Sequence, residues 1–311
     1  MVVLLKSKLR QGETFVRRYR LVYLVEVNLP DLQTPVRSLN CRGRLLTLER
    51  ARVMGILNLT PDSFYSESRI RTSADLLKSA ELMLNQGASI LDLGGQSTRP
   101  GATRIGVKEE YARVIPAMEL LARYFPDAII SIDTFYGAVA EAAIQAGASI
   151  INDVSAGQID KSILAVAAKY QVPYVLMHMQ GEPQTMQLQP NYRHIIEEIL
   201  RFFAKHLQKL SALSIQDVIL DPGFGFGKNL SHNYTLLQGL QDFQWTNRPM
   251  LVGLSRKKMA QMVTGSEANE ALYGSLALQV LALERGANLL RVHDVKPAVD
   301  AVKIVYQLET I

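Results

Sequence analysis

Short apolar runs recur along the chain from residue 52 to its carboxyl end. Each run is nearly continuous in apolar residues, which is typical of parallel strands that are buried on both faces. The pattern predicts eight strands, at 53–57, 89–93, 128–132, 149–151, 174–177, 218–220, 250–253 and 288–292. The segments between them have the helical period instead, as in the apolar stripe of Val107, Val114 and Met118.

Eight such units in about 250 residues predict an α/β fold, the (β/α)8 TIM barrel. A doubly wound open sheet is the alternative that the same alternation allows. Three helix-to-strand joints are near copies: "QGASILDLGG" at 86–95, "AGASIINDVS" at 146–155 and "RGANLLRVHD" at 285–294. Each joint is short, and each strand after it ends in polar residues. Barrel enzymes place their catalytic groups at the carboxyl ends of the strands, so we expect the active site there.

The first residues of the chain do not share this pattern. Residues 1–37 show no sustained period, and they lack the order of a secretory signal. We expect a weakly ordered N-terminal extension here, followed by one barrel domain over residues 38–311. The segment 38–50, "SLNCRGRLLTLER", is predicted to form a short hairpin that caps the amino end of the barrel.

Composition narrows the class of protein. Apolar residues make up 48% of the chain and charged residues 20%, the balance of a globular protein with a core. No apolar run reaches the ~18 residues of a membrane-spanning helix, so no membrane contact is expected. The single cysteine, Cys41, cannot form an internal disulfide and favours a reducing compartment, which we expect to be the cytoplasm.

The charge and the commonest motifs exclude several functions. The net charge is +5, but beyond residue 20 the basic residues interleave with acidic ones, so no nucleic-acid partner is expected. The glycine-rich run "DPGFGFGKN" at 221–229 is neither a Walker loop nor a dinucleotide fingerprint, because Pro222, Lys228 and Asn229 occupy defining positions. The five histidines do not cluster at zinc spacing, so no zinc site is expected.

Polar side chains follow the predicted strands where they end. Asp133, Asn152, Asp221 and Lys257 should meet at the mouth of the barrel, where a carboxylate without partners is costly. An ion pair between Asp221 and Lys257 is the structural interpretation. A site for a flat heterocycle is the functional one, because a carboxylate accepts two parallel bonds from adjacent N–H groups. So many polar groups converge that we favour the ligand site.

A cationic rim is predicted beside this site, which suits small anions such as phosphates. Its members are Arg99, Arg256, Lys257, Arg291 and His293. Asn58, at the end of the first strand, offers an oxygen ligand for Mg²⁺ that substrate phosphates would mainly hold. The loop "GGQSTRPGATRIG" at 94–106 is long and polar, and we expect it to close over the site.

These residues together resemble a known family. The blocks "MGILNLTPDSF", "LDLGGQSTRPGA", "SIDT", "INDV", "LMHMQG", "ILDPGFGFGKN", "LVGLSRKK" and "RVHDV" are similar in sequence, order and spacing to those of dihydropteroate synthases. The resemblance extends from about residue 38 to the carboxyl end. It implies a transferase of folate biosynthesis that joins p-aminobenzoate to 6-hydroxymethyl-7,8-dihydropterin diphosphate and releases pyrophosphate and 7,8-dihydropteroate.

The resemblance also implies roles for individual residues. The pterin would be bound by Asp133, Asn152, Met177, Asp221 and Lys257. The diphosphate would contact Asn58, Arg291 and His293, with Asn58 also at the Mg²⁺ cofactor. The p-aminobenzoate would lie against Thr98, Arg99, Pro100 and Phe226. Asp133, Lys257 and Arg99 are the implied catalytic residues. A homodimer and competition by sulfonamides are further implications of the family.

Three features depart from the family pattern. The first loop lacks the usual glycine pair after "DSF", Gln96 replaces a common Glu, and Lys258 stands where some members have Ser. Two other functions stay open. A pterin-dependent methyltransferase would need a cobalamin module, for which the chain has no room. A non-catalytic pterin-binding barrel would be expected to lose some of Asp133, Arg99, Lys257 and Arg291, which are all present.

Overall fold

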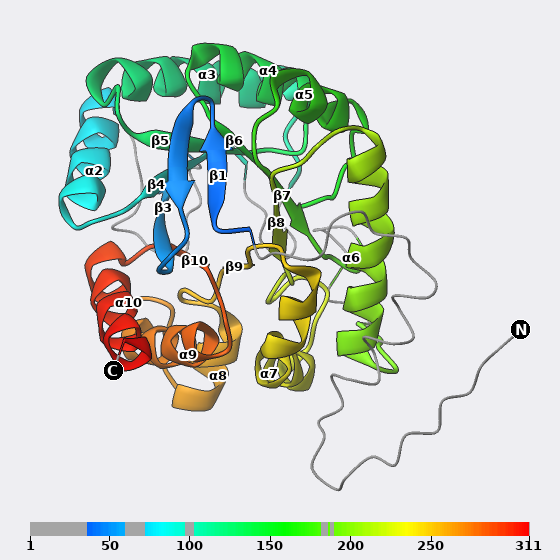
Figure 1. Cartoon of the computed structure of the whole chain (residues 1–311). Helices are drawn as coiled ribbons and strands as arrows, with labels where there is room; N and C mark the ends of the chain where they lie inside the picture. The colour runs from blue at the N-terminus through cyan, green and yellow to red at the C-terminus, as the bar shows by residue number, and fades with distance from the viewer. Residues whose placement is uncertain (1–35, 60–71, 97–102, 182–185, 187–189, 311) are drawn as a thin grey trace, which may run out of the picture.

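Eight parallel strands form the centre of the molecule (Figure 1). The computed structural model describes residues 36–59, 72–96, 103–181, 186 and 190–310. The strands follow one another in the order β8-β7-β6-β5-β4-β3-β10-β9, and a parallel bridge from Leu220 to Met250 joins the two ends of the series. The predicted TIM barrel is therefore confirmed, and the alternative, a doubly wound open sheet, is not what the chain forms. The strands are β3 Arg52–Asn58, β4 Ile90–Gly94, β5 Ile129–Asp133, β6 Ile150–Asp153, β7 Tyr174–Met177, β8 Val218–Asp221, β9 Leu251–Val252 and β10 Leu289–Val292.

Helices surround this barrel and bury their apolar faces against the outer side of the strands (Figure 1). In α3, for example, Val114, Met118 and Leu121 are buried, as the helical period predicts, whereas Val107 in the first turn is exposed. The helices are α2 Ser73–Asn85, α3 Val107–Tyr124, α4 Gly137–Ala146, α5 Ser162–Tyr170, α6 Ile195–Ala212, α7 Leu230–Gln238, η2 Leu240–Thr246, α8 Lys258–Thr264, α9 Leu272–Glu284 and α10 Val295–Glu309. No helix in the described part of the chain is both long and apolar enough to span a membrane.

The predicted hairpin is present and closes the amino end of the barrel. Strands β1 Ser38–Cys41 and β2 Arg44–Thr47 pair antiparallel and lie across the front of the barrel in Figure 1. Leu39, Cys41 and Leu46 are buried in one cluster with side chains from the lower lumen. The hairpin therefore acts as an apolar plug. The predicted extension over residues 1–37 lies almost wholly outside the described residues.

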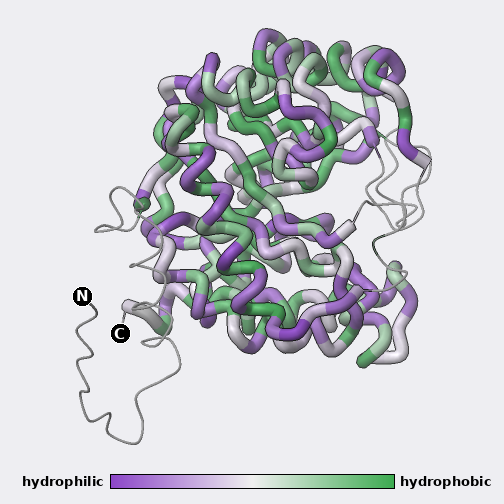
Figure 2. Tube along the Cα trace, turned by 90° about the vertical axis from the view of Figure 1, so that its right-hand side faces the viewer, coloured by the Kyte–Doolittle hydropathy of each residue, from purple (hydrophilic) through white to green (hydrophobic). Residues whose placement is uncertain are grey.

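The side chains that line the lumen change from apolar to polar along the strands. Every second side chain of a strand points inward, so alternate residues form this lining. The inward residues near the amino ends are apolar and pack against the hairpin: Met54, Ile90, Ile150, Val175, Ile219, Leu251 and Leu289. Two residues further along β4, β6, β8 and β10 come Asp92, Asn152, Asp221 and Arg291. Green stretches of the tube run through the middle of the molecule, where purple stretches also occur among them (Figure 2). A polar site thus rests on an apolar floor.

The three similar joints have the conformation that their glycines predict. Gly87, Gly147 and Gly286 have φ of 98°, 127° and 90°, which a side chain would disfavour. A Cβ at Gly147 would also approach Ala122 to 2.5 Å. These tight joints lie at the amino ends of the strands, so the longer connections gather at the carboxyl ends.

Candidate active site

A cavity of about 480 Å³ opens at the carboxyl ends of the strands, a size that suits a small molecule. It contains every predicted site residue that lies in the described part of the chain: Asn58, Asp133, Asn152, Met177, Asp221, Phe226, Lys257, Arg291 and His293. Thr98, Arg99 and Pro100 lie outside the described residues, as do residues 60–71 of the first loop. Side chains from distant parts of the sequence thus line one site.

An ionic network occupies one side of the cavity. The Arg291 guanidinium donates from Nε to Asp92 Oδ2 and from Nη2 to Asp133 Oδ2, each over 2.6 Å. Asn152 donates from Nδ2 to the same oxygen of Asp92 over 3.0 Å. The two carboxylates raise the pKa of Arg291 even though burial lowers it, so this side chain stays cationic.

Asp92 is a residue of this network to which the sequence analysis gave no role. It is fully buried, and its Oδ1 has no hydrogen-bond partner among the described residues. The similar joints contain a signal that could have found it. Asp92, Asn152 and Arg291 occupy the same position in the three copies, and the folded chain joins these three side chains to one another.

Burial moves the pKa values of the ionisable groups in the cavity. It raises the pKa of Asp133 to about 7; Arg291 opposes the shift, and the carboxylates of Asp92, Asp153 and Asp221 add to it. Burial also raises the pKa of Asp221 and lowers that of Lys257 to about 8. Groups that titrate near neutral pH in a cavity are candidates for catalysis.

Asp221 and Lys257 face the same cavity without a direct ion pair between them in the described structure. Asp221 Oδ1 accepts a hydrogen bond from the backbone N–H of Gly223 over 2.7 Å. Lys257 Nζ donates to the carbonyl oxygen of Phe224 and lies 4.9 Å from the centre of the Phe226 ring. The structural interpretation of this pair is therefore not supported, and the second oxygen of Asp221 is left for another donor.

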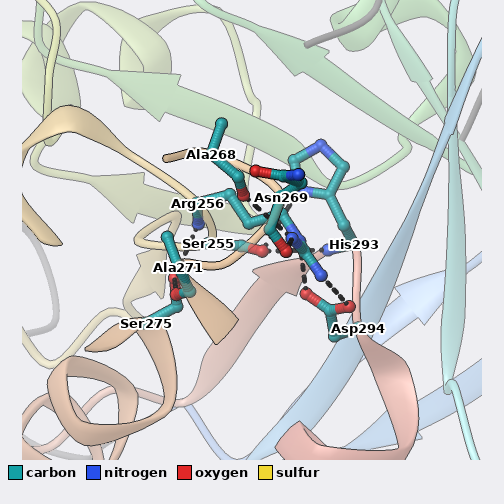
Figure 3. Close-up of polar contacts among 8 residues, drawn as sticks. All are labelled: Ser255, Arg256, Ala268, Asn269, Ala271, Ser275, His293 and Asp294. Carbon is teal, nitrogen blue, oxygen red and sulfur yellow. Dashed lines mark hydrogen bonds and ion pairs between the residues drawn. The ribbon is translucent and has the colours of Figure 1, made fainter. Parts of the chain in front are cut away.

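Arg256, a predicted member of the cationic rim, lines the cavity but is itself buried in a cluster of polar contacts (Figure 3). Its guanidinium forms a fork with Asp294, with N···O distances of 2.8 and 2.9 Å, and Nη1 donates to the carbonyls of Ala268 and Asn269. In the same view Ser255 Oγ lies 3.1 Å from His293 Nδ1. Arg256 thus joins the turn after β9 to the end of β10, next to two predicted ligand-binding residues.

Two of the residues that depart from the family pattern, Gln96 and Lys258, lie in the described part of the chain, and both line the cavity. Gln96 accepts a hydrogen bond from the backbone of Ile105, and its Nε2 is buried without a partner among the described residues. The carboxylate of Glu110 nearby is also buried, which raises its pKa to about 7. Lys258 lines the cavity as the first residue of α8.

The comparisons with known proteins agree with this geometry. The model of the pterin binding enzyme family matches residues 54–293. The dihydropteroate synthase of Escherichia coli K12 is 45% identical over 270 residues, which cover 86% of this chain and 95% of that protein. The chain belongs to the dihydropteroate synthase family of pterin-binding enzymes.

Solved structures of this family have the same fold. The Yersinia pestis synthase in complex with a sulfonamide drug superimposes with a TM-score of 0.85 at 43% identity, over 88% of this chain and 100% of that one. The Xanthomonas albilineans synthase in complex with 7,8-dihydropteroate gives a TM-score of 0.77 at 36% identity, over 88% and 99% of the two chains. The region that the family model matches, residues 54–293, includes every described residue of the cavity.

Proposed function

We propose that the chain is a transferase that condenses p-aminobenzoate with 6-hydroxymethyl-7,8-dihydropterin diphosphate, releasing pyrophosphate and 7,8-dihydropteroate. The observation that carries the proposal is the cavity, where all the described residues implied by the family resemblance meet. The relatives bear the same activity in their names, and this chain covers almost their full length.

The pterin ring fits the polar side chains at the strand ends that line the cavity. Asp221 keeps one carboxylate oxygen without a donor among the described residues, so it can accept the adjacent N–H groups of the ring. Asn152 donates to Asp92, which turns its amide oxygen toward an N–H donor of a ligand. Lys257 can donate to a ring acceptor, and Met177 supplies an apolar contact. These groups would hold the ring flat between the strand ends.

The diphosphate belongs on the other side of the cavity. Among the described residues Arg291 uses Nε and Nη2 for its two carboxylates, which leaves Nη1 to bind an anion, and His293 follows the end of β10. The Asn58 side-chain oxygen and Asp133 Oδ2 both lie beside Gly94, each 3.6 Å from where its Cβ would be. The Asn58 oxygen suits Mg²⁺ that is held mainly by phosphates, with Asn58 as the protein ligand. The ion would neutralise the leaving diphosphate.

The residues then account for the reaction. The C–O bond between the pterin methylene and the diphosphate breaks, and the aromatic amine forms the new C–N bond and loses a proton. Asp133 is placed to stabilise the positive charge that develops on the methylene, which is an electrostatic contribution. Phe226 would pack on the benzoate ring, with Lys257 above it. Thr98, Arg99 and Pro100 remain predicted contacts of p-aminobenzoate, and Arg99 a predicted catalytic group.

We also propose that the enzyme is a cytoplasmic homodimer. Helix α9, "LYGSLALQVLALE", is apolar around its whole circumference, a pattern of helices that are covered on all sides. It packs beside α10 (Figure 1), yet Tyr273 on α9 and Ile304 on α10 are 82% and 65% exposed. A second copy of the chain would cover this α9–α10 face. The single buried thiol of Cys41 is consistent with a reducing compartment.

The test is pyrophosphate release by the purified chain. Release should require both p-aminobenzoate and Mg²⁺, and a sulfonamide should compete with p-aminobenzoate. Asp221→Asn should weaken pterin binding by at least about tenfold in calorimetry, because a neutral amide loses the charge-assisted bonds, while the melting temperature changes little. No pyrophosphate with both substrates present would refute the function, and unchanged affinity of the variant would refute the role of Asp221.

A further inference from the structure

The loop between β8 and α7 wraps around the amine of a buried lysine. Gly223, Gly225 and Gly227 have φ of 71°, 79° and 59°, so the chain reverses its curvature at every second residue. A Cβ at Gly223 or at Gly227 would collide with the carbonyl oxygens of residues 178 and 180. The loop thus lies directly on the backbone that follows β7.

Lys228 fills the cup that this loop forms. Its Nζ donates to the carbonyls of Gly223 over 2.9 Å and Phe226 over 3.0 Å, and it lies 3.1 Å from His178 Nδ1. The residue is only 2% exposed. A lysine amine has no acceptor capacity when it is protonated, so all of its N–H groups are directed to this loop and to the end of β7.

The same loop supplies one wall of the cavity. The N–H of Gly223 holds the Asp221 carboxylate, the carbonyl of Phe224 accepts from Lys257, and the Phe226 ring faces Lys257. The side chain of Asn233 fixes the loop from the other side, because it accepts from the N–H of Gly225 over 2.7 Å. A change in the curvature of the loop would therefore move several ligand-binding groups together.

We propose that Lys228 is a positioning residue that holds the 222–228 loop in the shape needed to bind both the pterin and p-aminobenzoate. Lys228 is among the residues that line the cavity, but its amine is directed to the loop carbonyls and to His178, so the loop residues present the binding groups. The inference rests on the proposed function for its kinetic test. The loop shape itself can be measured without any turnover.

The charge on the Lys228 amine makes its contact with the 222–228 loop sensitive to pH. The ionisable groups around Lys228 are His178 from β7, Asp221 from β8, Lys257 before α8 and His232 on α7. Burial lowers the pKa of Lys228 to about 7, and Asp221 opposes that shift. In an opened loop the amine would meet water and return toward its ordinary pKa of about 10.4. The opened loop then binds more protons above pH 7, so rising pH favours the closed loop.

The kinetic test compares Lys228→Met and Lys228→Gln with a control, Lys169→Met. Lys169 is exposed on α5 and pairs with Glu141 at the surface. We expect KM for both substrates to rise about tenfold in the two Lys228 variants, with kcat within about threefold, because the lost contacts support binding of the ground state. The control should match the wild type.

A role in folding alone predicts a different result. Fewer correctly folded molecules would lower kcat and the melting temperature and leave both KM values unchanged, and that result would overturn the proposal. A wild-type enzyme that releases no pyrophosphate would count against the proposed function instead, since it says nothing of the loop.

Hydrogen exchange on the wild-type protein decides the matter even if neither variant folds. The amides of Gly223, Gly225 and Phe226 are all hydrogen-bonded within or beside the loop. After correction for intrinsic exchange, their protection should rise several-fold from pH 7 to 9, while amides of α4 stay constant. Constant protection of the loop over this range would show that Lys228 does not hold it closed.

Discussion

Asp133 illustrates how a buried environment adapts a single side chain to its task. It accepts a bond from Arg291 and shares the surroundings of three further carboxylates, Asp92, Asp153 and Asp221. Its pKa of about 7 means that the negative charge is lost when the pH falls only slightly below neutral. A charge that stabilises a developing cation must be present during the reaction, so the rate should follow this titration.

We therefore expect kcat to fall as the pH drops through 7. Asp133→Asn should lower kcat by about a hundredfold and remove this acidic limb, because the amide carries no charge at any pH. Steady-state kinetics from pH 5.5 to 9 provide the measurement, with a melting curve at each pH as the control for folding. An acidic limb that persists in the variant would assign the titration to another group.

Turns between elements, rather than the strands themselves, orient several of the binding groups. Arg256 has a φ of 54° and so adopts a left-handed conformation that is unusual for a residue with a side chain. Its bonds to Asp294 and to the carbonyls of Ala268 and Asn269 hold the chain there (Figure 3). Lys257 follows directly and enters the cavity.

Arg256→Lys should lower the free energy of unfolding by about 2 kcal/mol and also lower kcat/KM. A lysine cannot form the planar fork with Asp294 and reach both carbonyls as well. Urea denaturation measures the loss. Arg201→Lys is a suitable control, since Arg201 forms a surface pair with Glu197 and its replacement should change stability by less than about 0.5 kcal/mol. Equal stability of the two variants would contradict this role.

Much of the fold could be predicted because its signals are local. The apolar runs, the helical periods and the glycines at the joints each depend on a few neighbouring residues. Which side chains of the site pair with one another was harder to predict from the sequence. Arg291 was predicted to bind a diphosphate, but its bonds to Asp92 and Asp133 join residues 199 and 158 positions apart. Lys228 was noted only as a mismatch to a nucleotide motif, since nothing in its neighbourhood shows that it would be buried against His178.

The molecule as a whole has one face that suits association. If the α9–α10 face is a dimer interface, replacing Tyr273 and Ile304 together with Glu should produce monomers, because charges would have to be buried there. Tyr124→Glu is the matched control, as Tyr124 is also exposed but lies at the end of α3, across the barrel (Figure 1). Sedimentation equilibrium at micromolar concentration distinguishes the masses. A monomeric wild type would refute the interface.

The hairpin that closes the amino end also determines how ligands can move. Because Leu39, Cys41 and Leu46 fill the lumen at the amino ends of the strands, that end of the described barrel gives ligands no path to the cavity. The two proposed substrates, the pterin against Asn152 and Asp221 and p-aminobenzoate near Phe226, would therefore both enter from the carboxyl ends of the strands. Because they would share one side of entry, we expect each substrate, once bound, to slow the arrival of the other.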